Sequence, residues 1–326
     1  MTTRALLTFV ITGFLVLGLM SHTQAQTARR GSGDLARMLK AAEVRSASGA
    51  KNTCDSNPNA DDEQKLAALK TCIAGLENRG VWQLQKEKYA QLETLTATRA
   101  KVEQLNVLHE LSNKMRRYDD PVEALKIKQR ILDDPAATVN LKVAQHQAMA
   151  IDYANVFFDS EKARFHLQAM ESINRSRRSE LRSEFADLMD ATTSGARAAV
   201  LLSEGSYDEA LKESGRYIEG YKRFITQIPS LERQFRVDTP DAVRGYIYTG
   251  RTYVVETLMR SGQLDAAETQ ARELLKEQLG ILSVESPQLA RTLVMYSRVL
   301  INLGRFKEAQ FFNEKALAYL QRSGIE

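Results

Sequence analysis

The sequence predicts an all-α protein built from stacked helical hairpins, and three observations predict it. Apolar residues recur every three or four positions through most of the chain, which is the period of one helix face. Glycine and proline are sparse, at 17 and 6 of 326 residues, and no segment alternates with the period of two that marks a strand. A turn motif recurs along the chain at intervals of about 40 residues, a spacing typical of helical solenoids.

The clearest hairpin spans residues 286–320. Ser286-Pro287 is a typical helix start, because serine can cap the first turn and proline is tolerated at the first helical position. Gly304 predicts the turn, because glycine readily adopts the left-handed conformation that ends a helix. The buried face of the second helix is predicted to contain Phe306, Ala309, Phe312, Ala316 and Leu320.

The turn of this hairpin recurs upstream. Residues 262–267 match residues 304–309 at a spacing of 42 positions, and residues 205–211 give another good match. Residues 159–163 and 118–124 give weaker ones. The alanines that align at this turn, which are 39, 47, 57 and 42 positions apart, are Ala124, Ala163, Ala210, Ala267 and Ala309.

This pattern resembles a tetratricopeptide repeat (TPR). The 42-residue period, with Leu-Gly near the end of one unit and Ser-Pro opening the next, is similar to that of kinesin light chains. The residues that carry the resemblance are Gly304, Phe306, Glu308, Ala309, Ala316 and Leu317. The resemblance implies a right-handed superhelical solenoid of about five to six hairpins. For any single copy, an ordinary helical hairpin with a glycine turn is the alternative interpretation.

Residues 1–25 have the features of a secretory signal peptide. Arg4 supplies a positive start, residues 5–20 form an apolar run, and Thr23-Gln24-Ala25 offers a cleavage site. The run is shorter than the ~20 residues that a spanning helix needs, although an uncleaved anchor is the alternative. We therefore expect an exported protein, periplasmic or secreted by a bacterium, with no membrane span after cleavage.

A flexible N-terminal arm is predicted over residues 26–62. A short helix at residues 34–44 is expected to dock its apolar face onto the first repeat or onto a partner, and we prefer docking within the chain. That face contains Leu35, Met38, Leu39 and Ala42. The two cysteines of this exported chain, Cys54 and Cys72, predict one disulfide.

The repeat domain is predicted to span residues 63–322, followed by a tail at residues 323–326. Residues 63–80 and 81–117 are helical in composition, and residues 81–117 fit either one long helix or the end of a degenerate repeat followed by the first helix of the next. We prefer a degenerate hairpin at residues 63–97, which would make six hairpins. Residues 228–237 fit either a loop or a helix extension, and the sequence does not decide between them.

The sequence contains no pattern that predicts catalysis. The histidines lack zinc-site spacing, and there is no nucleophile elbow, dinucleotide-binding loop or phosphate-binding loop. Removing residues 1–25 takes away Arg4 and no acid, so the net charge falls from +4 to +3, which is too weak to imply nucleic acid. We expect a non-enzymatic protein without metal or cofactor.

A helical solenoid offers a concave groove, lined by the first helix of each hairpin, that holds an extended peptide or another helix. Its positions lack the Lys/Asn/Arg pattern of TPR carboxylate clamps. Carrying the groove positions of the repeat onto this chain gives Asn106, His109, Asn113, Asp152, Asn155, Thr252, Glu256, Arg291, Arg298 and Asn302.

The C-terminal end is predicted to be an interface. After Leu320 too few residues remain for the polar capping helix with which solenoids usually finish. Phe311, Phe312 and Tyr319 are therefore expected to form an apolar patch that packs on a partner or on a second copy, as a homodimer.

These features favour an exported scaffold or adaptor that mediates protein–protein interactions in the periplasm or cell envelope. Two alternatives remain open. An export signal followed by such repeats is similar to the N-terminal part of bacterial CHAT-domain proteins, which implies a regulatory subunit of a separately encoded CHAT-type protease or other hydrolase. A component of envelope polysaccharide or secretion machinery is the other alternative.

Overall fold

The computed structural model describes residues 33–43, 54, 60–77, 82–97, 100–118, 120–180, 183–231, 240–284 and 286–322. Within these residues every regular element is a helix, so the predicted all-α class is confirmed. The predicted signal peptide lies outside the described residues, as does most of the predicted arm. No helix in the described part of the chain is both long enough and apolar enough to cross a membrane.

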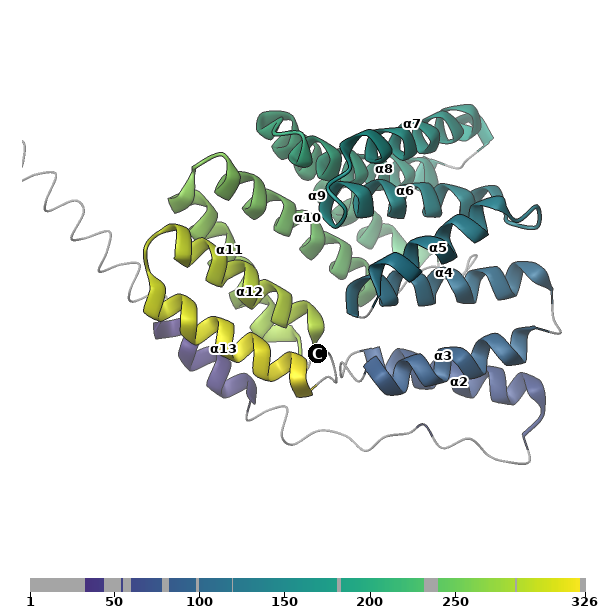
Figure 1. Cartoon of the computed structure of the whole chain (residues 1–326), viewed down its shortest axis with the longest axis horizontal. Coiled ribbons are helices and arrows are strands. Elements are labelled where there is room, and N and C mark those ends of the chain that lie inside the picture. The colour runs from purple at the N-terminus through teal and green to yellow at the C-terminus, as the bar shows by residue number, and fades with distance from the viewer. Residues whose placement is uncertain are drawn as a thin grey trace, which may run out of the picture.

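The described helices form six consecutive hairpins that stack into a solenoid (Figure 1). Their bounds are α2 (Asp62–Glu77) with α3 (Trp82–Thr96), α4 (Lys101–Tyr118) with α5 (Pro121–Asp133), α6 (Val139–Asn155) with α7 (Ser160–Arg177), α8 (Ser183–Ser203) with α9 (Tyr207–Leu231), α10 (Pro240–Arg260) with α11 (Leu264–Ile281), and α12 (Pro287–Asn302) with α13 (Phe306–Arg322). A short 3-10 turn, η1 (Arg178–Glu180), follows α7. The TPR-like solenoid inferred from the repeats is therefore confirmed, including the degenerate first hairpin that we preferred to one long helix.

The last three hairpins close with the glycine turn that the sequence predicts. Gly205, Gly262 and Gly304 have φ values of 78°, 80° and 71°, in the left-handed region that favours glycine. In each turn the residue after the glycine donates its backbone N–H to a carbonyl five positions earlier, as Arg305 does to Leu300 at 2.8 Å. These bonds satisfy carbonyl groups that the end of a helix would otherwise leave unpaired.

Phe158 stands where the third hairpin should have its turn glycine, because it lies five residues before Ala163, as Gly304 lies five before Ala309. Its φ is 53° and its side chain is 74% exposed. The left-handed conformation costs a residue with a Cβ about 1–2 kcal/mol, a cost that glycine avoids. Part of this advantage is lost, because glycine has more conformational freedom in the unfolded chain to give up on folding. We expect Phe158→Gly to raise the free energy of unfolding in urea by about 1 kcal/mol. Phe158→Ala keeps the Cβ and should give no such gain; equal gains in both variants would contradict this explanation.

The fourth and fifth hairpins pack closely because three glycines face large or crowded neighbours. A Cβ added at Gly220 would lie 2.4 Å from the Cβ of Ala191. The ring of Tyr217 lies between Gly195 of α8 and Gly250 of α10, where added Cβ atoms would approach it to 2.6 Å. Contacts this short require the absence of a side chain, so these glycines set the spacing of α8, α9 and α10.

Two glycines of α9 should respond oppositely to alanine. Gly220→Ala should lower the free energy of unfolding by about 1–3 kcal/mol, the usual effect of overpacking. Gly215 has no atom within 4 Å of an added Cβ, so Gly215→Ala should raise it by about 0.5–1 kcal/mol through helix propensity alone. Thermal denaturation of the two variants checks this, and a Gly220→Ala variant at least as stable as the native protein would show that α8 and α9 are not packed so closely.

α9 continues as a helix to Leu231, so the first part of the undecided segment 228–237 is a helix extension. Residues 232–239 lie outside the described residues. The predicted disulfide is present between Cys54 and Cys72, with a Cα–Cα distance of 5.1 Å, and it joins residue 54 to α2.

The helix at residues 33–43, which we call the cap helix, lies along α13 at the opposite end of the chain (purple in Figure 1). Leu35, Leu39 and Ala42 are at most 2% exposed and share one apolar cluster with Phe312 and Tyr319. The Glu43 carboxylate accepts a hydrogen bond from the Tyr319 hydroxyl at 2.9 Å and pairs with the Lys315 ammonium at 2.8 Å.

The expectation of an uncovered C-terminal end is therefore wrong for this chain. Phe312 and Tyr319 are each 1% exposed, and Phe311 is half-buried. The reason is that a helix from the N-terminal segment covers the last hairpin. In addition, Leu320 packs against an apolar cluster of the first two hairpins, which includes Leu66 and Val107, so the end of α13 reaches the N-terminal part of the solenoid.

Candidate protein-binding surface

The first helices of the second to sixth hairpins form a continuous inner layer. α4 contacts α6, α6 contacts α8, α8 contacts α10, and α10 contacts α12. Side chains at equivalent positions on these helices should therefore lie next to one another in register. This layer is where the candidate groove residues belong.

The sequence-predicted residues of α10 and α12 come together on this layer. Arg298 donates two hydrogen bonds to the Glu256 carboxylate, at 3.0 and 3.1 Å, although the residues are 42 positions apart. Arg260 donates to the same carboxylate at 2.8 Å, and the amide of Asn302 donates to the Arg298 carbonyl at 2.8 Å. The Arg298 side chain remains 50% exposed. The arrangement is an exposed arginine that a neighbouring repeat holds in place.

Two further predicted residues belong to the same helices but are less involved. Arg291 is exposed on α12, and its Nε donates to the Pro287 carbonyl at 3.2 Å. The Thr252 hydroxyl donates to carbonyl groups of its own helix, at 2.9 Å from Tyr248 and 2.8 Å from Thr249. Thr252 therefore supports α10 itself, whereas Arg291 adds a second exposed cation to α12.

A second group lies where α4 meets α6. The Nδ1 atom of His109 lies 2.6 Å from the amide nitrogen of Gln145, and its Nε2 atom lies 3.3 Å from that of Asn113. Burial lowers the pKa of His109 to about 4; the hydrogen bond between His109 and Gln145 opposes this effect, and the charge of Lys128 adds to it. His109 is therefore neutral near pH 7. Asn106 is exposed on the same helix.

Asp152 does not lie on an open surface, which corrects its prediction as a partner-binding residue. It is 1% exposed, and its carboxylate pairs with the ammonium of Lys128 at 2.8 Å and with Nε of Arg116 at 3.0 Å. Lys128 itself is fully buried. Asp152 therefore neutralises a buried lysine, while Asn155, nearby on α6, is half-buried.

The position of Lys128 in the sequence is a signal for this ion pair. Lys128 lies between Ala124 and Ile131 on the buried stripe of α5. A lysine in the middle of an apolar stripe requires an acidic partner, because an unpaired buried charge is very unfavourable.

A pair of histidines was also missed. The Nδ1 atoms of His146 and His166 lie 2.9 Å apart, and the ring of Tyr153 stacks on His166 at a centroid distance of 5.5 Å. Burial, followed by the charge of His146, lowers the pKa of His166 to about 4. Burial and the charge of Lys142 lower the pKa of His146. One N–H between the two Nδ1 atoms is enough for this hydrogen bond, so two neutral rings can form it. Because both pKa values are lowered, the pair is neutral near pH 7.

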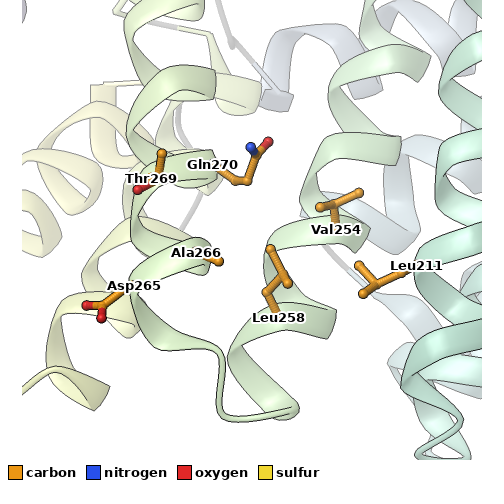
Figure 2. A pocket seen from close by; sticks show the side chains of 7 residues that line it. All are labelled: Leu211, Val254, Leu258, Asp265, Ala266, Thr269 and Gln270. Carbon is orange, nitrogen blue, oxygen red and sulfur yellow. The ribbon is translucent and has the colours of Figure 1, made fainter.

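A pocket of about 530 Å³ lies on another part of the solenoid, between α9, α10 and α11 (Figure 2). Figure 2 shows Leu211 of α9 facing Val254 and Leu258 of α10 at its apolar side. The α11 side is formed by Asp265, Ala266, Thr269 and Gln270. Nothing in the repeat pattern predicted this pocket.

Within the described residues, no three His, Cys, Asp or Glu side chains are grouped so as to hold a metal ion. The structure thus brings together Glu256, Arg298 and Asn302 on one side and His109 and Asn113 on the other. It places Asp152 in the interior, where it pairs with Lys128 of α5 and Arg116 of α4.

Comparison with known proteins gives a loose structural likeness. No family model matches the chain, and no curated protein matches it significantly. Similar solved structures are the nearly identical TPR-like repeats of a putative kinesin light chain from Podosopora anserina. One, a variant, has 15% identity and a TM-score of 0.34, with 82% of this chain and 100% of that chain covered. The other has 15% identity and a TM-score of 0.33, with 80% and 98% covered. At these TM-scores the description of this chain as TPR-like rests on its own repeating hairpins.

Proposed function

We propose that this protein is an exported, non-enzymatic scaffold that binds segments of other proteins along its inner layer of first helices. The observation that supports this most strongly is the exposed arginine face of α12. Arg298 is held by Glu256 of the neighbouring repeat, so its side chain is ordered before any ligand arrives. Preorganisation reduces the entropy lost on binding.

The chemistry of this face suits a segment that presents carboxylates or backbone carbonyl groups. Arginine has five N–H donors, and the two bonds from Arg298 to Glu256 leave others for a ligand. Arg291 adds a second cation, and Ile301, 49% exposed on the same helix, adds an apolar contact. Such a mixture of arginine and exposed apolar groups is common in protein interfaces.

Two features support export. The first is the signal-like sequence of residues 1–25. The second is the Cys54–Cys72 disulfide, because disulfides persist mainly in oxidising compartments. The mass of the mature N-terminus, together with cell fractionation, tests this part of the proposal.

Site-specific photo-crosslinking in cells tests the binding surface. A photoreactive residue is placed at position 301 or 302, which leaves Arg298 in place, and at position 276 as a control, because Lys276 is exposed on α11. We expect positions 301 and 302 to capture the same protein and position 276 not to capture it. Arg291→Ala should reduce the yield at both inner positions. Capture at position 276 alone, or no effect of Arg291→Ala, would refute the proposal.

A further inference from the structure

The cap helix occupies the surface of α13 like a ligand. It buries a one-sided apolar face, formed by Leu35, Leu39 and Ala42, against the last hairpin. One charged contact fixes its C-terminal end, where Glu43 meets Lys315 and Tyr319, 272 and 276 positions away. This is how an amphipathic helix binds a groove, with anchors at i, i+4 and i+7.

The cap helix fills this surface incompletely at its other end. A pocket of about 590 Å³ remains between the start of the cap helix and the turn and first residues of α13. The cap helix lines it only with Gly33 and Ala36, while α13 lines it with Phe306, Phe311 and Phe312. Phe306 is 66% exposed there. On the α13 side the pocket thus combines these aromatic rings with the charged residues Arg305, Lys307 and Glu308, and among the described residues no large side chain of the cap helix lines it.

We propose that this surface of α13 is a docking site for an amphipathic helix of a partner protein, and that the cap helix holds the site until the partner replaces it. The partner helix has aliphatic residues at the positions of Leu35, Leu39 and Ala42, and a carboxylate at that of Glu43. It differs from the cap helix in having a bulky apolar residue at the position of Ala36, which fills the pocket beside Phe306. This inference rests on the proposed function only in assuming that the protein binds segments of other proteins. The docking surface on α13 is separate from the inner layer of first helices.

The connection of the cap helix to the chain permits this exchange. Glu43 precedes Cys54 by 11 positions in the sequence, and the disulfide joins Cys54 to α2. A displaced cap helix thus remains attached to the solenoid at an effective concentration of the order of millimolar, and can return. A partner succeeds only by binding more tightly than the cap helix does, which the unfilled pocket allows. A second copy of this chain would offer the same Ala36 and gain nothing by the exchange.

Peptide binding to the full-length chain tests the proposal. Two fluorescent peptides with the sequence of residues 33–43 are titrated onto it, one native and one carrying Ala36→Leu. Because each buried CH₂ group contributes about 0.8 kcal/mol, we expect the Ala36→Leu peptide to bind at least ~10-fold more tightly. The chain that itself carries Ala36→Leu should bind the same peptide at least ~10-fold more weakly than the native chain, because its own cap competes better.

A charge exchange locates the site. Lys315→Glu in the chain weakens the contact of its own Glu43 and that of the peptide's Glu43 alike, so the informative comparison is between peptides on this variant. The Ala36→Leu peptide that also carries Glu43→Lys should bind the Lys315→Glu chain more tightly than the Ala36→Leu peptide does, and this preference should reverse on the native chain. Equal affinity of the native and Ala36→Leu peptides, no such reversal, or dimers of the unliganded chain formed by exchange of cap helices would overturn the proposal. Arg291→Ala should leave peptide affinity unchanged. A loss of inner-layer crosslinks with intact peptide binding would therefore count against the proposed function alone, and the reverse result against this docking site alone.

Discussion

Replacing Asp152 by alanine should lower the free energy of unfolding by about 3–5 kcal/mol, the usual effect of removing one partner from a buried ion pair. Lys128 is fully buried and Asp152 is 1% exposed, so the variant leaves an ammonium group in the interior without its counter-charge. Arg116 is 20% exposed and can reach water, so Lys128 accounts for most of the loss. Urea unfolding followed by circular dichroism near pH 7 measures the effect.

Two control variants separate the charge effect from simple loss of packing. The double variant Lys128→Met/Asp152→Leu removes both charges at similar volume and should recover most of the stability. Glu204→Ala removes the partner of Arg164, whose side chain is 58% exposed, and should cost less than about 1 kcal/mol. If Asp152→Ala costs no more than Glu204→Ala, the two residues do not form a buried pair.

Lowering the pH from 8 to 5 should reduce the free energy of unfolding by about 2 kcal/mol through His109 and by a similar amount through His166. Both have a folded-state pKa of about 4, below the ordinary value of 6.5, chiefly because of burial. Below pH 6.5 the unfolded chain therefore binds more protons than the folded chain, and stability falls as the pH falls. The loss of stability develops between pH 6.5 and about 4. At pH 5, which is about 1.5 pH units below 6.5, each histidine has lost about 2 kcal/mol, because each pH unit contributes ~1.36 kcal/mol.

Urea unfolding at pH 8 and pH 5 checks this, with His109→Gln as the comparison. Glutamine keeps a polar group beside Gln145 but does not titrate, so this variant should lose about 2 kcal/mol of the difference between the two pH values, whatever its absolute stability. An unchanged pH difference in His109→Gln would show that His109 is not buried as a neutral group.

In the His146–His166 pair, protonation of both rings would place two cations 2.9 Å apart.

The sequence predicts the hairpins well because their signals are local. Gly262 and Gly304 end helices within a few residues of the aligned alanines, and Pro287 starts α12 where the Ser-Pro motif indicates. The same turn survives at Phe158 without glycine, because Asp159 caps α7 by accepting the N–H of Lys162 at 3.0 Å. Local hydrogen bonds of this kind fix the hairpin even when one residue of the motif is missing.

The placement of the cap helix was not predictable from the sequence. The face with Leu35, Leu39 and Ala42 indicates a helix that docks, but any apolar face of similar width would accept it. Its partner contacts on α13 are more than 270 positions away, as the separation of 272 between Glu43 and Lys315 shows. Periodicity gives the face of a helix and contains no information about which distant face it meets.

The same limit explains the mixed outcome for the candidate groove residues. Asp152, Glu256 and Arg298 each lie 11 positions before an aligned alanine, so the repeat register predicts one shared environment for all three. Glu256 and Arg298 pair on the inner layer as that register implies. Asp152 is buried instead, because its carboxylate pairs with the buried ammonium group of Lys128 on the neighbouring hairpin. Register determines the position of a residue, and the side chains of the next hairpin determine its exposure.

Zero-length carbodiimide crosslinking tests most directly the central claim that the cap helix of this chain closes on its own C-terminal hairpin. The reagent joins carboxylates to amines that are already in contact, and the Glu43 and Lys315 side chains lie 2.8 Å apart. Lys70 and Glu103, which lie 3.4 Å apart on two other helices, provide an internal control. We predict a Glu43–Lys315 crosslink in the monomeric fraction, at a yield comparable to that of Lys70–Glu103. Formation of the control crosslink without Glu43–Lys315, or with Glu43–Lys315 confined to a dimeric fraction, would contradict the claim.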